Sequence, residues 1–389
     1  MQAYKEYTVT VAKSLEELEK IRDLWEGMQW HPNADVDFYL TLIDSRKEVV
    51  RPHIIILHHN NSPKTILVGR IEDAPLKYQI GYKVIYKPIV RQLRISFGGI
   101  MGELSDSVGA ALTEEIIDTL RRGEADVAFF NNLKVDSPIY QHALTIPGFL
   151  WRDHFAVDNV HFKLDLPSSL DEFYRSLSRN TRENLRRYSR KLLRTFGENI
   201  TVKCFQHEHE IEYLMRDIEE IAAKTYQRGL GVGLSNDIET RRRLLLGLQR
   251  RWLRAYVLYI NNKPCAFWHG YNYCKTFFIG VPGYDPEYDI YRVGHFLHMK
   301  MIEDLFTMES IDAIDYGFGD AQYKRSFCNQ NWKEASFYLF APTGKGLKLN
   351  LARMMTAGIS RIVQTTLKRT RLLTKVKKTL RSRLQNKTI

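Results

Sequence analysis

The stretch from Asp315 to Lys324 gathers side chains that can move protons and hold charge. Asp320 is a candidate general base or an anchor for an amine, Tyr323 is a candidate proton donor, and Lys324 can hold a phosphate or an oxyanion. His269 is a second candidate base, because an ordinary histidine pKa of about 6.5 allows proton exchange near neutrality. The competing interpretation makes His269 a core residue and Tyr323 and Lys324 surface residues. The functional interpretation places these residues in a ligand site.

A second group of residues is suited to binding a phosphate. Apolar residues recur at three- and four-residue spacing over 294–307, which predicts a helix that Gly294 opens. A helix start carries unpaired N–H groups and the positive end of the helix dipole, so a glycine there lets an anion approach closely. The candidate cofactor-binding residues here are Arg292, Val293, Gly294 and His295. The candidate substrate-binding residues around them are Tyr284, Asp285, Tyr291 and Asp315.

These candidates require a particular order of elements to bring them together. The run 277–281 has the aromatic and β-branched content of a buried strand, and residues 311–316 read as another. The predicted helix lies between them, and a glycine-flanked loop at 316–324 follows. A strand over 266–273 carries His269. Strand, loop, helix, strand and loop in succession predict a ligand cleft.

The same stretches resemble a known family. Residues 284–285, 291–294, 315–320 and 323–324 are similar to acyltransferase domains of the CelD type in the GNAT superfamily, which is related to the FemAB peptidoglycan-bridge enzymes. Residues 178–187 resemble the basic helix that begins the same domain. The resemblance covers roughly residues 165–342. It departs from the family at Arg292-Val293-Gly294, where Ser-Pro-Gly is common, and the stricter Arg/Gln-x-x-Gly-x-Gly/Ala loop is absent.

The resemblance implies a GNAT-like α/β fold and an acyltransferase that uses acyl-CoA as co-substrate without a metal. It also implies an acceptor from cell-envelope or exopolysaccharide synthesis, such as a sugar nucleotide, and a cytoplasmic enzyme near the inner membrane. Two alternatives stay open. One is a FemAB-like transferase with aminoacyl-tRNA as donor, and the other is a non-catalytic membrane-associated scaffold with a degenerate GNAT fold.

A strongly basic helix precedes these motifs. Residues 175–194 contain eight Lys or Arg and one acid, Glu183, and several arginines share a face. Arg182 and Arg186 are candidate ligands for phosphate, because a guanidinium binds phosphate oxygens in a bidentate manner. A solvated linker helix is the competing interpretation of equal weight.

The first half of the chain repeats the same order of elements. Ser14 has capping-box spacing to Glu17 and precedes a helix predicted to run to about Trp30. Residues 53–57 and 65–71 predict a hairpin; a strand at 93–97, a glycine loop at 98–102, a helix at 107–121 and a strand at 127–130 follow. The sequence therefore predicts tandem GNAT-like domains over 1–164 and 165–342, each with a mixed sheet flanked by helices.

The basic charge of the chain is concentrated in a tail over 343–389. The net charge is +12, yet residues 341–389 hold 13 Lys or Arg and no acid, which leaves the rest nearly neutral. Apolar residues from Met355 through Leu384 recur at helical spacing. A basic amphipathic helix favours an anionic membrane surface over nucleic acid, and packing on the protein's own body is the third interpretation.

Composition limits the remaining classes of function. The chain has no N-terminal signal pattern and no apolar run near the ~20 residues that span a bilayer. The four cysteines lack metal or disulfide spacing, which indicates a reducing compartment and no structural zinc. The run 207–210, His-Glu-His-Glu, is read as solvated rather than metal-binding.

Overall fold

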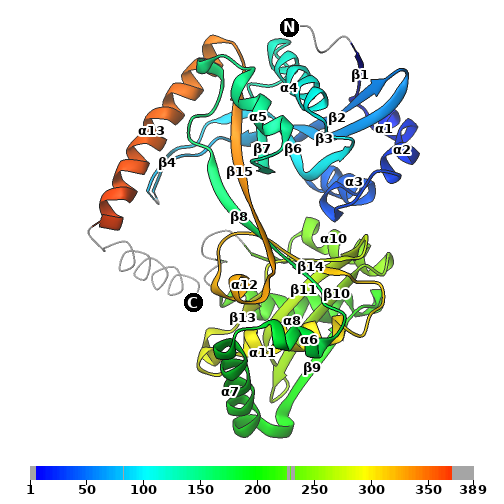
Figure 1. Ribbon diagram of the computed structural model, residues 1–389, viewed down its shortest axis with the longest axis vertical. Coiled ribbons are helices and arrows are strands. Elements are labelled where there is room, and N and C mark those ends of the chain that lie inside the picture. Colours follow the sequence, from blue (N-terminus) through cyan, green and yellow to red (C-terminus); the bar gives the residue numbers. More distant parts are fainter. Residues whose placement is uncertain (1–5, 82, 226–227, 229–232, 370–389) are drawn as a thin grey trace. The chain divides into compact units, whose positions relative to one another are not determined.

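The computed structural model describes residues 6–81, 83–225, 228 and 233–369 (Figure 1). These residues divide into two compact units: unit 1 consists of 6–160 with 332–369, and unit 2 of 161–331. Unit 2 is thus inserted into the sequence of unit 1, which is completed by the last described strand and helix. The domain boundaries that the sequence predicts, after residues 164 and 342, stay a prediction.

The strands of unit 1 follow one another in the spatial order β1–β2–β3–β6–β7–β15. Their bounds are β1 Tyr7–Ala12, β2 Val49–His59, β3 Ser62–Pro75, β6 Ile89–Gly102, β7 Val127–Lys134 and β15 Gln330–Phe340. β6 and β7 pair in parallel, whereas the other neighbours are antiparallel. A short hairpin, β4 Tyr78–Ile80 with β5 Lys83–Tyr86, projects beside this sheet.

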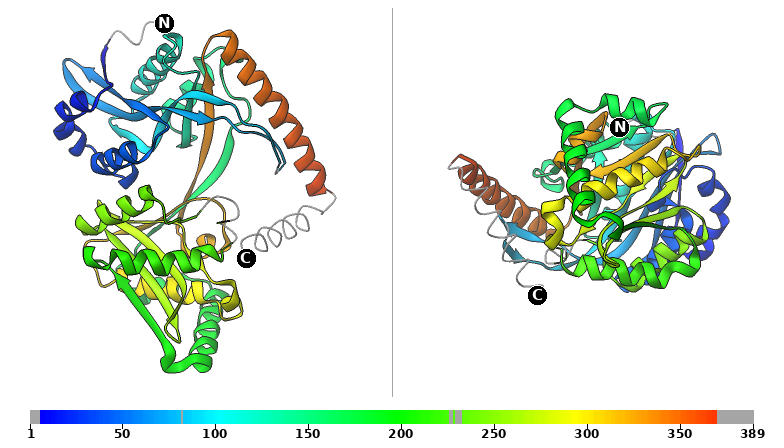
Figure 2. Two further views of the ribbon diagram at one scale, coloured as in Figure 1. Left: turned by 180° about the vertical axis from the view of Figure 1, so that it is seen from behind. Right: turned by 90° about the horizontal axis from the view of Figure 1, so that it is seen from below.

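Helices cover both faces of the unit 1 sheet because its central strands are apolar on both sides. Ile54 and Ile56 of β2 face the core that contains Trp25 and Tyr39, while Ile55 and its neighbours face the opposite core. The helical elements are α1 Leu15–Lys20, α2 Arg22–Glu26, η1 Pro32–Ala34, α3 Val36–Ser45, α4 Asp106–Arg121, α5 Pro138–Thr145, η2 Phe149–Trp151 and α13 Gly344–Arg369. In this unit, α13 lies beside the β4–β5 hairpin (Figure 2).

Unit 2 repeats the arrangement with the spatial order β8–β14–β12–β11–β10–β9. The strands are β8 Val157–Asp165, β9 Ile200–Phe205, β10 Leu253–Ile260, β11 Lys263–Tyr273, β12 Thr276–Ile279, β13 Gly283–Tyr284 (paired with β11) and β14 Ala313–Phe318. The described helical elements are α6 Leu170–Ser176, α7 Arg179–Phe196, η3 Gly197–Asn199, η4 Glu208–Glu210, α8 Ile211–Ala223, α10 Ile238–Gln249, η5 Pro286–Tyr291, α11 Val293–Leu305 and α12 Gln322–Phe327. β12 and β14 are the parallel pair, with α11 between them in sequence.

The predicted α/β class and its tandem strand, loop, helix and strand order are confirmed. In unit 1 the order is β6, α4, β7, and in unit 2 it is β12, α11, β14. The hairpin predicted around residues 60–63 is β2–β3. Among the residues that the structure describes, none of the helices combines the length and the apolar character that a membrane span requires.

Three local predictions were wrong. The helix from residue 15 to Trp30 breaks at Ile21, whose backbone leaves the helical region, into α1 and α2. The glycine loop at 98–102 is part of β6, because pairing with β3 continues on both sides and Gly98, at φ 75°, absorbs a register shift. Residues 322–327 are helix α12, so Tyr323 and Lys324 are helical rather than in a loop.

The basic tail is helical over its described part, α13. The predicted apolar positions beyond residue 369, from Leu373 to Leu384, lie outside the described residues. The segment 207–210 forms η4 and a capping box in which the Glu210 carboxylate accepts from the N–H of His207. Among the described residues, no group of His, Cys, Asp and Glu is arranged to hold a metal.

Candidate functional site

The parallel strands β12 and β14 part at one end of the unit 2 sheet. They pair from Thr276 opposite Ala313 to Phe278 opposite Asp315. Beyond that point β12 ends, whereas Gly317 and the next residue of β14 pair with β8. Two strands that part at the start of a helix expose backbone groups that a ligand can meet.

The helix that begins at this end, α11, has an open start. Its N-cap residue, Arg292, lies in the left-handed region at φ 54°, and no side chain in the described part of the chain caps the helix. The Arg292 guanidinium pairs with Asp289 at 3.1 Å. A Cβ at Gly294 would lie 3.6 Å from the ring of Tyr284, which is ordinary contact. In the first turn of α11, the N–H of His295 donates to the carbonyl of Arg292 at 3.0 Å, whereas the N–H groups of Val293 and Gly294 lie at the positive end of the helix dipole beside Arg292, as in an anion-binding site.

Two of the predicted substrate residues instead hold the segment that precedes α11. The buried carboxylate of Asp285 accepts hydrogen bonds from Lys224 at 2.7 Å and from the N–H of Glu287 at 3.0 Å. The ring of Tyr291 packs edge-on against Phe196 of α7, with centroids 4.9 Å apart. These contacts fix the segment, and therefore the position of Arg292, against α8 and α7.

A cavity of about 420 Å³ opens between α7, the start of α11 and α12. Its wall includes Arg292, His295 and Tyr323 from the predicted set. Burial lowers the pKa of His295, so its imidazole is neutral at pH 7. The other lining residues are Ser178, Asn180, Thr181, Asn184, Leu185, Tyr188, Gln322, Ser326 and Phe327. The volume is within the range of small-ligand sites.

An aromatic cluster lies beside this wall. The indole N–H of Trp268 donates to the carbonyl of Gly294 at 3.0 Å, and its ring stacks on His298 at 4.5 Å. His298 Nε2 and the hydroxyl of Tyr316 are 2.7 Å apart, and the ring of Tyr323 stands edge-on to both Trp268 and His298. Burial lowers the pKa of His298 to about 3 and raises that of Tyr316 well above its usual value. The cluster thus fixes the Tyr323 ring with uncharged groups.

Lys324 is a positioning residue at the end of β14. Its ammonium donates to the carbonyls of Tyr316, Gly317 and Phe318 at 2.7, 3.2 and 2.8 Å. Burial lowers the pKa of Lys324 to about 8. An ammonium has three N–H donors, and all three are engaged here, so Lys324 fixes the strand end from which α12 begins. This geometry does not present it to a phosphate or an oxyanion.

Asp315 also stabilises this strand end. Its Oδ1 atom lies 2.8 Å from His161 Nε2 and accepts from the N–H of Gly317 at 2.7 Å. The pair is buried. Asp315 therefore anchors β14 to β8.

The structure does not bring Asp320 and His269 into the cavity. Asp320 is exposed and pairs with Arg325 at 2.5 Å, and this hydrogen bond lowers the pKa of the carboxyl. Successive residues of a strand face opposite sides of a sheet, and Trp268 faces α11. His269 consequently faces the other side, where a Cβ at Gly280 would lie 2.1 Å from its Nε2 atom. Its ring is buried, its Nδ1 atom has no hydrogen-bond partner among the described residues, and burial lowers its pKa to about 4.

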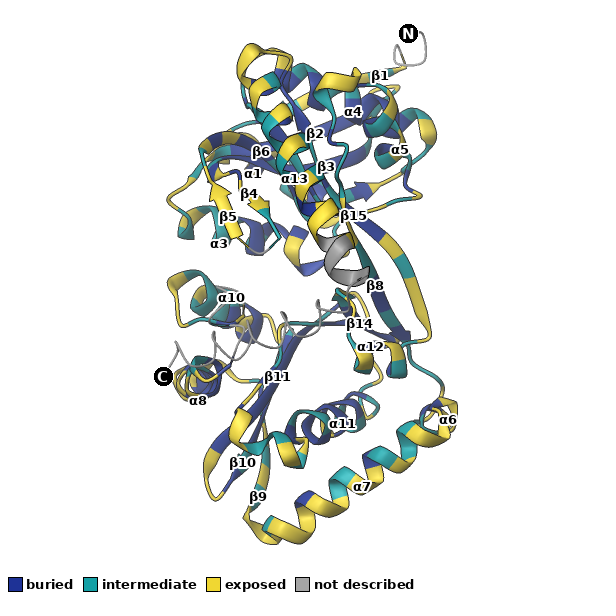
Figure 3. Ribbon diagram, turned by 90° about the vertical axis from the view of Figure 1, so that its left-hand side faces the viewer, coloured by how far each residue is buried: buried dark blue, intermediate teal, exposed yellow. Residues whose placement is uncertain are grey.

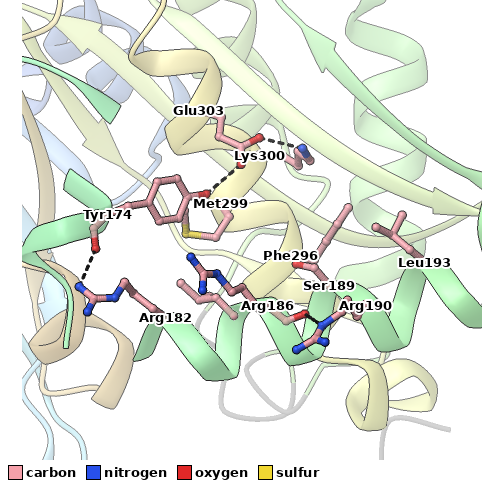
Figure 4. A pocket seen from close by; sticks show the side chains of 11 residues that line it. Tyr174, Arg182, Arg186, Ser189, Arg190, Leu193, Phe296, Met299, Lys300 and Glu303 are labelled. Carbon is pink, nitrogen blue, oxygen red and sulfur yellow. Dashed lines mark hydrogen bonds and ion pairs between the residues drawn. The ribbon is translucent and has the colours of Figure 1, made fainter. Parts of the chain in front are cut away.

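The basic helix α7 forms a second hollow, of about 480 Å³, with α6 and α11 (Figure 4). Arg182 donates to the carbonyls of Arg175 and Leu177, both at 2.9 Å, and so closes the end of α6. Arg186 and Arg190 also line the hollow, and neither has a carboxylate partner among the described residues. The remaining wall is mainly apolar, and it includes one acid, Glu303, which pairs with Lys300. The lining residues besides these are Tyr174, Leu185, Ser189, Leu193, Phe296 and Met299.

The sequence interpretation missed several residues of the cavity and its support. His298 comes one helical turn after Gly294, and Trp268 is the neighbour of His269 on β11. Both were recognisable from periodicity, since position 298 shares a helix face with 294 and position 268 faces away from 269. Tyr188 of α7 and Ser178, the N-cap residue of α7, are far from α11 in sequence, and no local pattern connects them with that helix.

Known proteins share this fold. A family model described as an acetyltransferase (GNAT) domain matches residues 179–325, and no curated protein matches the sequence. FemX, a solved structure, is 10% identical over 80% of this chain and 93% of its own, with a TM-score of 0.51. The C-terminal domain of a proposed lysylphosphatidylglycerol synthetase from Agrobacterium fabrum is 10% identical over 87% of this chain and 96% of its own, with a TM-score of 0.50.

At this identity the solved structures show a common fold, and the family match falls on the part of unit 2 that holds α7, α11 and α12. Each unit has a mixed sheet and a helix that lies between its two parallel strands in sequence. Residues 179–325 are therefore similar to an acetyltransferase (GNAT) domain in sequence, and the solved structures share the fold.

Proposed function

We propose that unit 2 transfers an acyl group from acyl-CoA to an amine or hydroxyl of its acceptor. The observation that carries the proposal is the cavity of about 420 Å³ at the open start of α11, close to where β12 and β14 part. An acyl-CoA consists of phosphates, a flexible arm and a thioester, and each of these parts can be assigned to a region of this cavity. The GNAT family match supports the reaction class.

The phosphates lie at the start of α11 in this proposal. The N–H groups of Val293 and Gly294 and the Arg292 guanidinium supply donors and positive charge. Gly294 has no side chain to obstruct a phosphate there. The arm of the donor then follows the cavity toward α12, and the thioester comes to Tyr323.

The chemistry uses two side chains of the cavity wall. The acceptor nitrogen attacks the thioester carbon, its bond to carbon forms, and the carbon–sulfur bond breaks. His295, neutral at pH 7 because burial lowers its pKa, takes the proton of the attacking nitrogen. Tyr323 gives its hydroxyl proton to the leaving thiolate. The His295 imidazolium then releases its proton to water and the Tyr323 oxygen takes one up from water, so both side chains return to their starting state. The products are the acylated acceptor and free CoA.

The acceptor in this proposal carries a phosphate. Arg186 and Arg190 line the hollow between α7 and α11 without carboxylate partners, and a phosphate is the group that two such guanidinium ions bind best. A sugar nucleotide or another envelope or exopolysaccharide precursor, as expected for a CelD-type enzyme, has this chemistry.

The test of the donor is the thermal midpoint of the full chain with acyl-CoAs of increasing length, free CoA and aminoacyl-tRNA. A donor at 100 times its dissociation constant stabilises the fold by about 2.7 kcal/mol. We expect a shift with an acyl-CoA, a smaller one with Arg292→Gln, and an unchanged one with the matched control Arg325→Gln. Arg325 is an exposed arginine that does not line the cavity. No shift with any CoA compound would overturn the proposal.

A second candidate is transfer from aminoacyl-tRNA. The observation that favours it is the row of arginines on α7, which lack carboxylate partners at 186, 187, 190 and 194 among the described residues. The resemblance to FemAB-like enzymes implies such a donor. RNA binding depends steeply on salt because phosphate contacts release counterions. A midpoint shift with aminoacyl-tRNA that disappears at high salt, together with none for acyl-CoA, favours this candidate.

A further inference from the structure

One face of the basic helix α13 is fixed to unit 1. The side-chain amide of Asn350 donates to the carbonyl of Leu150 at 2.8 Å, and Arg353 pairs with Asp153 at 2.7 Å. Asn350 and Ser360 are buried on this face. The part of the basic tail that the structure describes therefore packs on the protein's own body.

The opposite face of α13 is apolar and exposed. Leu351, Met355, Ile359 and Ile362 are between 44% and 69% exposed. Their spacing of four, four and three residues puts them in one stripe along the helix. Large apolar residues exposed singly are ordinary, but a continuous stripe marks a contact with another apolar phase.

The β4–β5 hairpin continues this apolar surface. Val84, Ile85, Tyr86 and Ile89, in β5 and just after it, are between 44% and 64% exposed, and β5 has the colour of exposed residues in Figure 3. Two hydrogen bonds join the hairpin to α13. The hydroxyl of Tyr78 donates to the carbonyl of Leu349 at 3.0 Å, and the N–H of Gly81 donates to Ser360 Oγ at 3.0 Å. Segments more than 260 residues apart in sequence thus form one surface.

Both segments are basic and contain no acid. Residues 74–102 and 335–389 include no Asp or Glu. Lys83 and Lys87 flank the apolar residues of the hairpin, and Lys348 and Arg361 flank the stripe of α13. None of these four has a carboxylate partner among the described residues, whereas Lys345 of the same helix pairs with Asp126. The surface combines exposed apolar side chains with uncompensated positive charge.

We propose that the exposed faces of α13 and the β4–β5 hairpin together form a docking surface for an anionic lipid bilayer. Apolar side chains enter the boundary between head groups and acyl chains, while Lys and Arg meet the anionic head groups. Nucleic acid would use the positive charge but not the apolar residues. A second copy of the chain would bring like charges together across a two-fold axis. The proposal is independent of the reaction in unit 2.

The test is co-sedimentation of the full chain with vesicles of phosphatidylcholine, with and without phosphatidylglycerol. We expect binding to the vesicles that contain phosphatidylglycerol, and at least tenfold weaker partition for each of two variants. One is Ile85→Ser with Tyr86→Ser in the hairpin, and the other is Met355→Gln with Ile362→Gln in α13. All four residues are exposed, so the fold tolerates the changes. Leu15→Ser is the matched control, because Leu15 is an exposed apolar residue elsewhere in unit 1.

Three results would overturn the proposal. The first is that the wild-type chain does not bind either kind of vesicle. The second is that the hairpin variant binds like the wild type, because binding would then depend on the basic C-terminal residues alone. The third is a concentration-dependent dimer in light scattering that the hairpin variant abolishes. The wild-type chain could also bind RNA instead of vesicles, with an affinity that the apolar substitutions leave unchanged. That outcome is a case of the first result and overturns the proposal.

Discussion

The two units follow the same order of strand, helix and strand, but they close the start of the helix differently. In unit 1, Ser105 caps α4, and a Cβ at Gly109 would lie 2.6 Å from the Cβ of Pro138 and 2.8 Å from the nitrogen of Ile139 in α5. The two helices touch, and no ligand fits between them at this point. In unit 2, no side chain of the residues that the structure describes caps α11, and a cavity separates its start from α12.

The comparison shows that a shared fold does not by itself provide a shared site. A glycine near the start of the helix has opposite structural roles in the two units. Gly109 allows two helices to pack closely, whereas Gly294 has room around it. The cavity of unit 2 depends on α7 and α12 standing away from the first turn of α11.

The largest expected effect is on turnover. Tyr323→Phe removes the hydroxyl that we propose protonates the leaving thiolate, and we expect turnover to fall by about 10²–10⁴-fold. The counterpart in unit 1 is Tyr140→Phe in α5, where Tyr140 packs on Phe337. That variant should keep full activity, as measured by steady-state kinetics with the acyl-CoA that shifts the midpoint. Equal losses in both variants would contradict a reaction confined to unit 2.

The two glycines should respond differently to the same substitution. Gly109→Ala forces the new Cβ against Pro138 and the backbone of α5, and we expect the free energy of unfolding to fall by about 1–3 kcal/mol. Gly294→Ala should leave stability unchanged or raise it by up to about 1 kcal/mol, since alanine favours helix and space is available. It should also weaken acyl-CoA binding. Urea denaturation and calorimetric titration measure the two quantities, and a destabilised Gly294→Ala variant would show that α11 is not open.

Acid should destabilise the two units alike. Burial lowers the pKa of His53 in unit 1 and of His298 in unit 2 to about 3 from 6.5. The unfolded chain therefore binds more protons between these values, so stability is lost as the pH falls below 6.5. Each histidine contributes up to about 1.4 kcal/mol per pH unit in that window.

The measurement is the free energy of unfolding by urea between pH 7 and pH 5, for His53→Asn and His298→Asn separately. Each variant should show a shallower loss of stability toward acid than the wild type. A slope that neither substitution changes would mean that other groups govern the acid response.

The smallest effect is expected at the surface. Asp320→Asn breaks an exposed ion pair with Arg325 outside the cavity, and such pairs contribute little in water. Turnover should stay within about twofold of the wild type in the same assay. A loss as large as that of Tyr323→Phe would make Asp320 a residue of the reaction and would require α12 to move.

Local sequence patterns predicted the elements of unit 2 closely. The helix predicted over 294–307 is Val293–Leu305, and the strand predicted over 311–316 is Ala313–Phe318. The basic helix predicted from residue 175 is two helices, because α6 ends at Ser176 and Ser178 caps α7. The regular spacing of the arginines continues across this break, so it does not indicate that one helix ends and another begins there. Periodicity identifies the type of an element better than it identifies its ends.

The sequence by itself determined the tandem order of elements, the open glycine at the start of α11 and the basic tail, because each depends on neighbours within a few turns or strands. Only the tertiary structure decided which candidates meet. Trp268 rather than His269 faces α11. The alternation of side chains along β11 puts the two residues on opposite faces of the sheet, but it does not determine which face α11 covers. Lys324 is occupied by three carbonyls of β14, and α13 meets a hairpin far away in sequence. Such contacts depend on how distant segments pack, which no local pattern contains.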